Sequence, residues 1–325
     1  GGDNGTGYWT LMSAGSWPSI DPNSIGTSPV HMGAWEKLML GWLDYAIAMA
    51  GEDSTTTIGP AEGASTSGAQ ALITVLPPYD YTTELVAPEG DDPYYYYSGS
   101  GDDLDVTMRR ALDTPLATDT PLTFRAWYDI EPDWDYAYVE YSTDGGATWQ
   151  QANGNLSTDT DPNGQNFGHG ITGSSGGWVD GSYTIPVGAT HIGFRYWTDG
   201  AVAYPGFIVD SIALGGWSDN GSDTGWTLGG FSRVENGQVT TTYAHFYIAE
   251  SRSYVRNDVN LKGAYHFIEG NWVEKQPYAD GVLISYWNTR FTDNNTSQPP
   301  GEGLILPVDS HPQPMVSPVG GDYFG

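Results

Sequence analysis

The stretch from Phe124 to Trp149 has the sequence FRAWYDIEPDWDYAYVEYSTDGGATW, which is the pattern of two β-strands separated by an acidic turn. Apolar residues alternate with polar ones up to Ala126, and the alternation resumes over residues 136–141. Because successive side chains of a strand point to opposite faces, each segment can bury one face and expose the other. Asp144-Gly145 then supplies the positive φ that a hairpin turn requires, so the chain is expected to reverse there.

Similar alternation occurs on both sides of this stretch. Residues 104–108 have it before the stretch, and residues 192–196 and 207–212 have it afterwards. Several short strands with frequent turn signals predict a β-sandwich of the jelly-roll kind over residues 83–214. The counts of Gly 44, Tyr 22 and Trp 13 also favour a mainly β fold over a helical bundle.

Residues 1–50 form a separate segment, which contains the one helix that the sequence predicts. Pro29 can lie in its first turn after Ser28 as a cap, and Gly41 marks its end. Apolar residues recur between them at helical spacing, namely Met32, Trp35, Leu38, Met39 and Trp42. We expect a short amphipathic helix here.

Three further ranges complete the expected organisation. Residues 51–82 are predicted to be a linker with a short strand at 71–76, which Pro77-Pro78 ends. Residues 215–310 are predicted to be a second β-rich region, with strands near 240–248 and 282–287. Residues 311–325 are expected to be an extended tail.

The chain is strongly acidic and has no cysteine. With 11 Lys and Arg against 40 Asp and Glu, its formal net charge is −29, which disfavours binding to nucleic acid or anionic membranes. The absence of cysteine excludes disulfides, thiolate metal sites and a cysteine nucleophile. No apolar run reaches the ~18 to 20 residues of a membrane span. No signal peptide opens the chain, as expected of a mature or processed secreted protein.

The acidic turn inside the opening stretch is a candidate calcium site. Asp129, Glu131, Asp133 and Asp135 lie within seven positions between two strands, and alternate residues of an extended chain point the same way. Asp210, at the end of a later strand, can join them. Like charges packed together without a cation are unfavourable, and Ca²⁺ prefers carboxylate oxygens. We therefore predict calcium ligands at Asp129, Glu131, Asp135 and Asp210, with a solvated acidic turn as the alternative.

A second acidic segment is a weaker calcium candidate. Asp159, Asp161 and Asn163 match the first half of a calcium loop, and Gly164 follows them. The twelfth position is Gly170, so the closing glutamate is absent. A plain Asx and glycine turn is the favoured interpretation.

No catalytic site can be assigned from the sequence. The six histidines include no pair at the i, i+4 spacing of an H-E-x-x-H zinc helix. Gly173-Ser174-Ser175-Gly176-Gly177 is not the nucleophile elbow of a serine hydrolase. No pair of carboxylates is singled out for glycoside hydrolysis.

Residues 8–17, with the sequence YWTLMSAGSW, resemble the Met-turn segment of the immune inhibitor A-like zinc metallopeptidases. Residues 33–43 resemble the last helix of that family's catalytic domain. Three further blocks resemble the family in the same order along the chain, at 124–149, at 173–210 and at 278–312. The resemblance covers nearly the whole chain.

The resemblance implies a secreted bacterial protein whose family joins a zincin catalytic domain to β-rich domains. Met12 would be the hydrophobic floor beneath the zinc and would do no chemistry itself. The zinc helix and the general-base glutamate are missing from this chain, so residues 1–50 would be the C-terminal remnant of the catalytic domain, and zinc would belong to the missing part.

The leading hypothesis is that the chain is the C-terminal part of a secreted zinc metalloendopeptidase, inactive alone. It would support an upstream catalytic fragment and help to bind protein substrates. The first alternative is a calcium-stabilised extracellular β-sandwich with a binding or structural role. The second is one chain of a two-chain metallopeptidase produced by internal cleavage.

Overall fold

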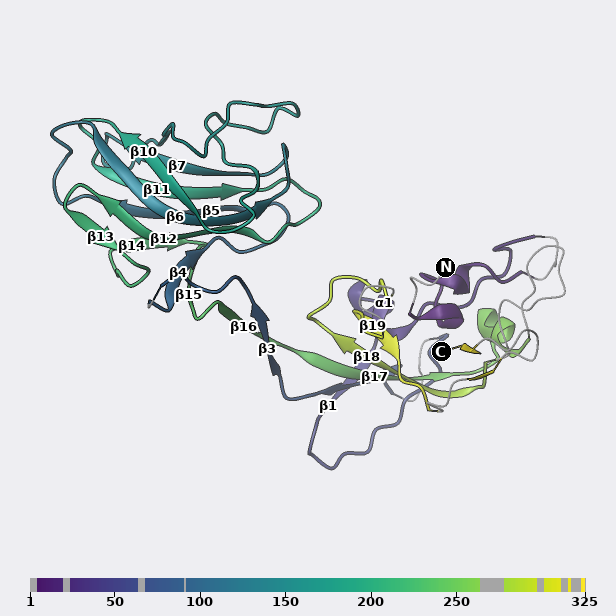
Figure 1. The fold of residues 1–325 in the computed structure, drawn as a ribbon. Helices are drawn as coiled ribbons and strands as arrows, with labels where there is room; N and C mark the ends of the chain where they lie inside the picture. Colours follow the sequence, from purple (N-terminus) through teal and green to yellow (C-terminus); the bar gives the residue numbers. More distant parts are fainter. Residues whose placement is uncertain are drawn as a thin grey trace. The chain divides into compact units, whose positions relative to one another are not determined.

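The computed structural model describes residues 5–19, 24–63, 68–90, 92–263, 278–296, 301–310, 315–316 and 323–324. The chain forms two compact units (Figure 1). Unit 1 consists of residues 1–81 and 241–325, and unit 2 consists of residues 82–240. The two units are described separately below.

Unit 2 contains two antiparallel sheets. The larger has nine strands in the order β10-β6-β12-β4-β15-β16-β3, with β13 paired to β12 and β9 paired to β6. Its strands are β3 (Tyr79–Glu84), β4 (Tyr94–Tyr97), β6 (Thr120–Ile130), β9 (Gly173–Ser174), β10 (Val179–Ile185), β12 (Gly206–Leu214), β13 (Trp217–Asp219), β15 (Ser232–Glu235) and β16 (Gln238–Tyr243). The smaller sheet has five strands in the order β14-β5-β11-β7-β8. Its strands are β5 (Asp105–Ala111), β7 (Tyr136–Ser142), β8 (Gln150–Gln151), β11 (His191–Trp197) and β14 (Trp226–Gly229).

The core of unit 2 lies between these sheets. In the smaller sheet β11 pairs with both β5 and β7, and Phe194 lies opposite Met108 and Val139 (Figure 1). The same apolar cluster includes Phe124 and Val209 from the larger sheet. The alternating residues that predicted strands therefore meet face to face, and the expected mainly β fold with a sandwich is confirmed.

The units divide the chain at positions that differ from the ranges expected from the sequence. Residues 215–240 were expected in a second β-rich region, but their strands pair with the sandwich. Trp226 of β14 lies opposite Arg110 of β5, and Ser232 of β15 lies opposite Tyr97 of β4. These pairings join residues more than 100 positions apart, so local patterning carries no signal for them.

Unit 1 contains a five-stranded sheet in the order β1-β2-β17-β18-β19. Strands β1 and β2 are parallel, and the other neighbours are antiparallel. The elements are η1 (Gly7–Trp9), η2 (Ala14–Ser16), α1 (Ala34–Met39), β1 (Tyr45–Met49), β2 (Ala71–Val75), β17 (His245–Arg252), η3 (Arg256–Lys262), β18 (Gly281–Asn288), β19 (Ile305–Pro307), β20 (Met315–Val316) and β21 (Tyr323–Phe324). Ala34 of α1 packs with Ile73 and Ile248 of the sheet in the core of this unit.

Helix α1 is shorter than the sequence predicted. Its N-cap is Gly33, whose backbone is extended, and no helix forms between Pro29 and Gly33. The preceding segment is held in another conformation, because the Val30 N–H donates to the Gly15 carbonyl at 2.8 Å. The predicted end near Gly41 is confirmed, since Gly41 has φ +72 and follows the last helical turn.

The strand predicted at residues 71–76 is present as β2, and those predicted near 240–248 and 282–287 correspond to β16 with β17 and to β18. Most of the predicted tail at 311–325 lies outside the described residues. No helix in the described ranges has the length and apolar character needed to cross a membrane.

Candidate metal centre and Met-turn segment

The acidic turn between β6 and β7 is compact and places its carboxylates in different directions. The Trp134 and Asp135 N–H groups donate to the Glu131 carbonyl at 3.4 Å and 3.2 Å, which closes the turn. Asp133 adopts the left-handed conformation with φ +67. Its N–H donates to Thr172 Oγ1, and its carbonyl accepts from Asn163 Nδ2. This turn presents Glu131 and Asp135 together, without Asp133.

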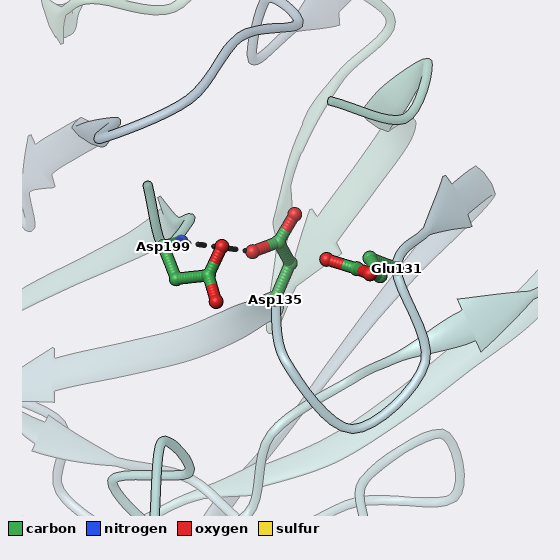
Figure 2. A group of neighbouring side chains, drawn as sticks. All are labelled: Glu131, Asp135 and Asp199. Atoms are coloured by element: carbon green, nitrogen blue, oxygen red, sulfur yellow. Dashed lines mark hydrogen bonds between the residues drawn. The ribbon is translucent and has the colours of Figure 1, made fainter. Parts of the chain in front are cut away.

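A third carboxylate joins them from the end of β11. One side-chain oxygen from each of Glu131, Asp135 and Asp199 lies within 4.8 Å of the other two (Figure 2). Trp197 of β11 lies opposite Tyr136 of β7, so the residues after β11 lie beside the start of β7. The Asp199 N–H donates to Asp135 Oδ1 at 2.9 Å. Within the described ranges this is the one group of three or more such side chains close enough to hold a metal ion.

Asp135 is the buried member of this group. Its side chain is 1% exposed, and Oδ2 has no hydrogen-bond partner among the described residues. A buried carboxylate oxygen without a donor is unfavourable, because desolvation is not compensated. A proton or a cation would satisfy this atom.

The electrostatics of the group point to the same need. Burial raises the pKa of Asp135 to about 6, and the nearby Asp199 and Glu131 charges add to the shift, which the Asp199 N–H partly offsets. Burial also raises the pKa of Glu131, with contributions from Asp199 and Asp102. A hard cation with oxygen ligands would replace the proton and remove the repulsion between the carboxylates.

Two of the residues predicted as calcium ligands lie elsewhere. Asp129 belongs to β6, where it pairs with Gly206 of β12 and Ser174 of β9, and it is not a member of the group. Asp210 is buried in β12, and its Oδ1 accepts the Ser211 N–H at 2.6 Å. Burial raises the pKa of Asp210 to about 6. The structure thus brings together Glu131 and Asp135 but neither Asp129 nor Asp210.

Asp199 was not identified from the sequence. It follows Trp197-Thr198 at the end of a predicted strand, but so do many aspartates in this acidic chain. Only the pairing of β11 with β7 brings it to Asp135, and a single sequence does not reveal that pairing.

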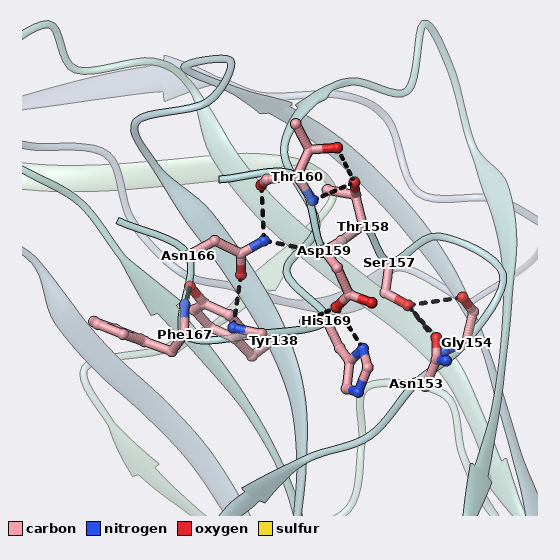
Figure 3. A network of polar contacts seen from close by, with 11 residues as sticks. Tyr138, Asn153, Gly154, Ser157, Thr158, Asp159, Thr160, Asn166, Phe167 and His169 are labelled. Carbon is pink, nitrogen blue, oxygen red and sulfur yellow. Dashed lines mark hydrogen bonds and ion pairs between the residues drawn. The ribbon is translucent and has the colours of Figure 1, made fainter. Parts of the chain in front are cut away.

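The second calcium candidate forms an internally bonded loop (Figure 3). Asp159 Oδ1 accepts the His169 N–H at 2.9 Å and lies 2.8 Å from His169 Nδ1. Asp161 Oδ1 accepts the N–H groups of Gln165 and Asn166. Asn163 donates to the Asp133 carbonyl instead of offering its oxygen to a neighbour. These bonds satisfy the Asp159 and Asp161 carboxylates within the loop, but they reach N–H groups 4 to 10 positions ahead, whereas an Asx turn reaches two positions ahead. The Asx and glycine turn favoured from the sequence stays a prediction.

The Met-turn segment is ordered and tied to α1. Thr10 Oγ1 donates to Glu36 Oε1 at 2.6 Å, and the Ser13 N–H donates to the Thr10 carbonyl. Thr10 and Ser13 are buried, whereas Met12 is 67% exposed. Met12 borders an open pocket of about 420 Å³. Its other lining residues are Thr6, Trp35, Glu36, Asp293, Asn294, Asn295, Leu304 and Ile305.

The histidines do not fit a zinc site. His169 contacts Asp159, His191 contacts Thr190, and His245 lies between Tyr286 and the Pro77 carbonyl. His31 is partly buried, and burial lowers its pKa, as does the Lys37 charge. His266 and His311 lie outside the described residues. Among the described side chains no histidine belongs to a metal-binding group, so we assign no zinc ligand.

Known proteins resemble this chain over almost its full length. It is 29% identical over 333 residues to the pre-pro-metalloprotease PrtV of Vibrio cholerae serotype O1, a match that covers 95% of this chain and 33% of the relative. It is 28% identical over 330 residues to immune inhibitor A of Bacillus thuringiensis subsp. alesti, a match that covers 96% of this chain and 45% of the relative. The chain thus spans between a third and a half of the length of these relatives.

Two family models divide the chain near the boundary between the structural units. Residues 53–237 match the MAM domain of immune inhibitor A-like proteins, and residues 240–322 match the VEG domain of immune inhibitor A-like metallopeptidases. The first match ends where unit 2 ends, close to Thr240. The chain therefore belongs to the immune inhibitor A-like family, as the Met-turn and the three further blocks indicated.

Proposed function

We propose that this chain is the non-catalytic part of a secreted zinc metallopeptidase of the immune inhibitor A type and does not cleave proteins alone. The observation that carries the proposal is the Met-turn: Thr10 and Ser13 are buried and bonded, yet Met12 is 67% exposed beside an open pocket. An exposed methionine in an ordered turn is expected where another segment completes the fold. In this family the segment above it would be the zinc helix.

The proposed partner is the catalytic part of an enzyme of this type. The chain spans 33% and 45% of two relatives that are named as a metalloprotease and as immune inhibitor A. Exposed apolar residues near α1 extend the surface that such a partner would cover, including Met39, Leu40 and Trp42. Zinc in that partner would supply an activated water for hydrolysis of protein substrates. The role of this chain would be to support the zinc-binding segment by packing the Met-turn against it, and to help hold the substrate.

Unit 2 is proposed to be a calcium-stabilised module within this arrangement. The supporting observation is the unpaired, buried Asp135 Oδ2 beside Glu131 and Asp199. A module of this kind could also serve a separate binding or structural role outside the cell, and this is the second candidate function. The two candidates share the calcium site and differ in whether a catalytic partner is needed.

Casein cleavage tests the first proposal. The purified chain with added zinc and calcium is expected to leave casein intact. Addition of the separately produced catalytic part of the Bacillus relative should give a complex that can be isolated by size-exclusion chromatography. Met12→Asp should weaken this complex at least about tenfold, because a carboxylate would be buried without a partner, while Met12→Leu should retain it.

Two outcomes would contradict the proposal. One is casein cleavage by this chain alone at a rate that does not fall when any co-purifying full-length enzyme is removed. The other is equal binding of the catalytic part by the Met12→Asp and Met12→Leu variants. Intact-mass analysis of native material then separates a two-chain enzyme from a single chain, since only the former contains a second, zinc-binding fragment.

A further inference from the structure

Unit 1 has a second open pocket, of about 330 Å³, at the end of β18. Its walls come from separate parts of the chain, namely Tyr79 at the start of β3, Tyr286 and Asn288 of β18, and residues 290–291 and 301–303 beyond β18. All of these positions belong to unit 1, and none of them lines the pocket of the Met-turn segment. Aromatic rings with a few polar groups around a pocket of this volume are typical of a small-ligand site.

The cation of this pocket is Arg290, which stacks on two aromatic rings. Its guanidinium carbon lies 3.5 Å from the centre of the Tyr81 ring and 4.8 Å from the centre of the Phe291 ring. Stacking fixes the plane of the guanidinium and leaves the N–H groups at its edge free to donate. Among the described residues its ion pair is with Glu302, at 3.7 Å between Nη1 and Oε2, and the Glu302 side chain is 45% exposed. Because so long and exposed an ion pair contributes little, the guanidinium can bind a carboxylate from outside the chain.

The tyrosine hydroxyls of the pocket are oriented by acceptors within the protein. Tyr79 Oη donates to Asn288 Oδ1 at 3.0 Å. Tyr286 Oη lies 2.7 Å from His245 Nδ1, and His245 Nε2 lies 2.7 Å from the Pro77 carbonyl. Because a carbonyl only accepts, Nε2 carries the hydrogen of the neutral imidazole, and Nδ1 accepts from the Tyr286 hydroxyl. Both tyrosines therefore use their hydrogens inside the protein, and their oxygens keep lone pairs that can accept from a ligand.

Asn288 adds a donor to the same pocket. It is buried, and its Oδ1 also accepts the Arg290 N–H at 3.1 Å, which assigns the other amide atom as Nδ2. The pocket thus combines a cation and an amide donor with two hydroxyl acceptors and aromatic rings. A ligand that matches them carries a carboxylate, hydroxyl donors and an apolar ring face. An acidic sugar has all three, whereas the carboxylate end of an apolar peptide has no hydroxyl donors.

We propose that this pocket binds an acidic sugar, meaning a glycan residue that carries a carboxylate, as a uronic acid does. Arg290 holds the carboxylate, Tyr79 and Tyr286 accept hydrogen bonds from the sugar hydroxyls, and the tyrosine rings contact the apolar face of the sugar ring. The formal net charge of −29 repels anions at long range, so recognition depends on direct contact with Arg290. This binding needs neither calcium nor a catalytic partner, so its failure would leave the proposed function unaffected.

Ligand-observed NMR with the whole chain tests the proposal with three probes. D-glucuronic acid carries the carboxylate, the hydroxyls and the ring. D-glucose lacks the carboxylate, and N-acetyl-phenylalanine has a carboxylate and a ring but no hydroxyls. The wild-type chain should bind glucuronic acid at least about tenfold more tightly than either of the other two, because only this probe satisfies both the guanidinium and the tyrosine oxygens.

Three variants assign the binding to this pocket. Arg290→Gln should weaken glucuronic acid binding at least about tenfold and have little effect on glucose. Glu302→Gln removes the competing carboxylate and should tighten glucuronic acid binding about two- to threefold. Arg233→Gln is the matched control, because Arg233 also stacks on a tyrosine, with its guanidinium carbon 3.5 Å from the centre of the Tyr94 ring, but lies in unit 2. That variant should bind glucuronic acid as the wild type does.

If circular dichroism shows that Arg290→Gln does not fold, Tyr286→Phe replaces it. This change keeps the ring and removes an accepting oxygen, so it should weaken glucuronic acid binding about threefold or more. Equal affinity of the wild type for glucuronic acid and glucose, or unchanged affinity in the folded variant, would overturn the proposal. Binding of N-acetyl-phenylalanine as tight as that of glucuronic acid would also overturn it, since the pocket would then recognise a peptide-like carboxylate rather than a sugar, as would the absence of binding by all three probes.

Discussion

The Asp199 N–H donates to Asp135 Oδ1 at 2.9 Å, across 64 positions of the sequence. This bond orients the buried Asp135 carboxylate and leaves Oδ2 without a partner. It also brings the Asp199 carboxylate to the group that Glu131 completes. The segment after β11 therefore supplies the third carboxylate, which the β6–β7 turn lacks. The candidate centre depends on the pairing of β11 with β7 rather than on a continuous motif.

Calcium should stabilise unit 2 through this group. At a concentration about 100 times Kd, a native-state ligand adds ~2.7 kcal/mol, which for a unit of this size raises Tm by roughly 5 to 10 °C. Asp135→Asn should abolish the shift, because it removes the central carboxylate while Asn Oδ1 still accepts the Asp199 N–H. Differential scanning calorimetry with calcium and with EGTA measures it.

The control for this prediction is Asp129→Asn. Asp129 lies in β6 outside the group, so this variant should keep the full calcium shift. An equal loss in both variants would place the ligands along the β6–β7 turn as the sequence pattern suggested. No shift in the wild type would favour the solvated acidic turn.

The calcium effect should grow with pH. Because burial raises the pKa of Asp135 to about 6, the metal-free folded state holds a proton that the unfolded chain has lost above about pH 4. This contribution to stability therefore declines between about pH 4 and pH 6 without calcium. Calcium must displace the proton, so its affinity should weaken about tenfold per pH unit below 6. Calcium titrations at pH 5.0 and 7.5 that give the same affinity would contradict this assignment.

Strands were easier to predict from this sequence than were the sites. The alternation in residues 120–130 and 136–142 is local, and it follows directly from burial of one face, so β6 and β7 were predicted correctly. The helix was predicted too long because apolar spacing continues before Gly33, whereas the Val30–Gly15 hydrogen bond holds that segment elsewhere. Tertiary contacts override local spacing there.

The candidate metal centre was only half predictable for the same reason. Glu131 and Asp135 are close in the sequence, and their proximity to a strand end was visible. Asp199 and Asp210 both follow or lie in later strands, and nothing in the sequence distinguishes them. The strand order decides that Asp199 reaches Asp135 while Asp210 lies beside Ser211.

Asp219 should be essential for the stability of unit 2. Its Oδ2 accepts hydrogen bonds from Tyr96 Oη at 2.9 Å and from Trp226 Nε1 at 2.8 Å, and Oδ1 accepts the Ser222 and Asp223 N–H groups. Asp219→Ala would leave the buried Trp226 Nε1 without this acceptor and the Tyr96 hydroxyl with only the Asp223 carbonyl, and should cost roughly 2 to 4 kcal/mol. Urea unfolding followed by tryptophan fluorescence measures this loss.

Two variants calibrate that result. Tyr96→Phe removes one donor and leaves Asp219 with its other partners, so it should cost only about 1 kcal/mol. Asp113→Ala changes an exposed acid and should stay within about 0.5 kcal/mol of wild type. If Asp219→Ala is no more destabilised than Asp113→Ala, the hydrogen bonds of Asp219 do not stabilise the fold.

Gly206 at the start of β12 should tolerate no side chain. Its φ is +99, and a Cβ there would lie 2.3 Å from the Gly99 carbonyl oxygen and 2.9 Å from Ser98 Oγ. These atoms cannot move freely, since Ser98 and Phe207 exchange backbone and side-chain hydrogen bonds that join β4 to β12. Gly206→Ala should therefore cost more than about 2 kcal/mol, through both backbone strain and steric contact.

Gly176→Ala is the matched control. Gly176 also has a positive φ, +66, but no atom lies within 4 Å of the position that a Cβ would occupy there. That variant should lose only about 1 kcal/mol from the left-handed backbone. Equal urea midpoints for the two alanine variants would show that the close approach of β4 to β12 is not what requires glycine at position 206.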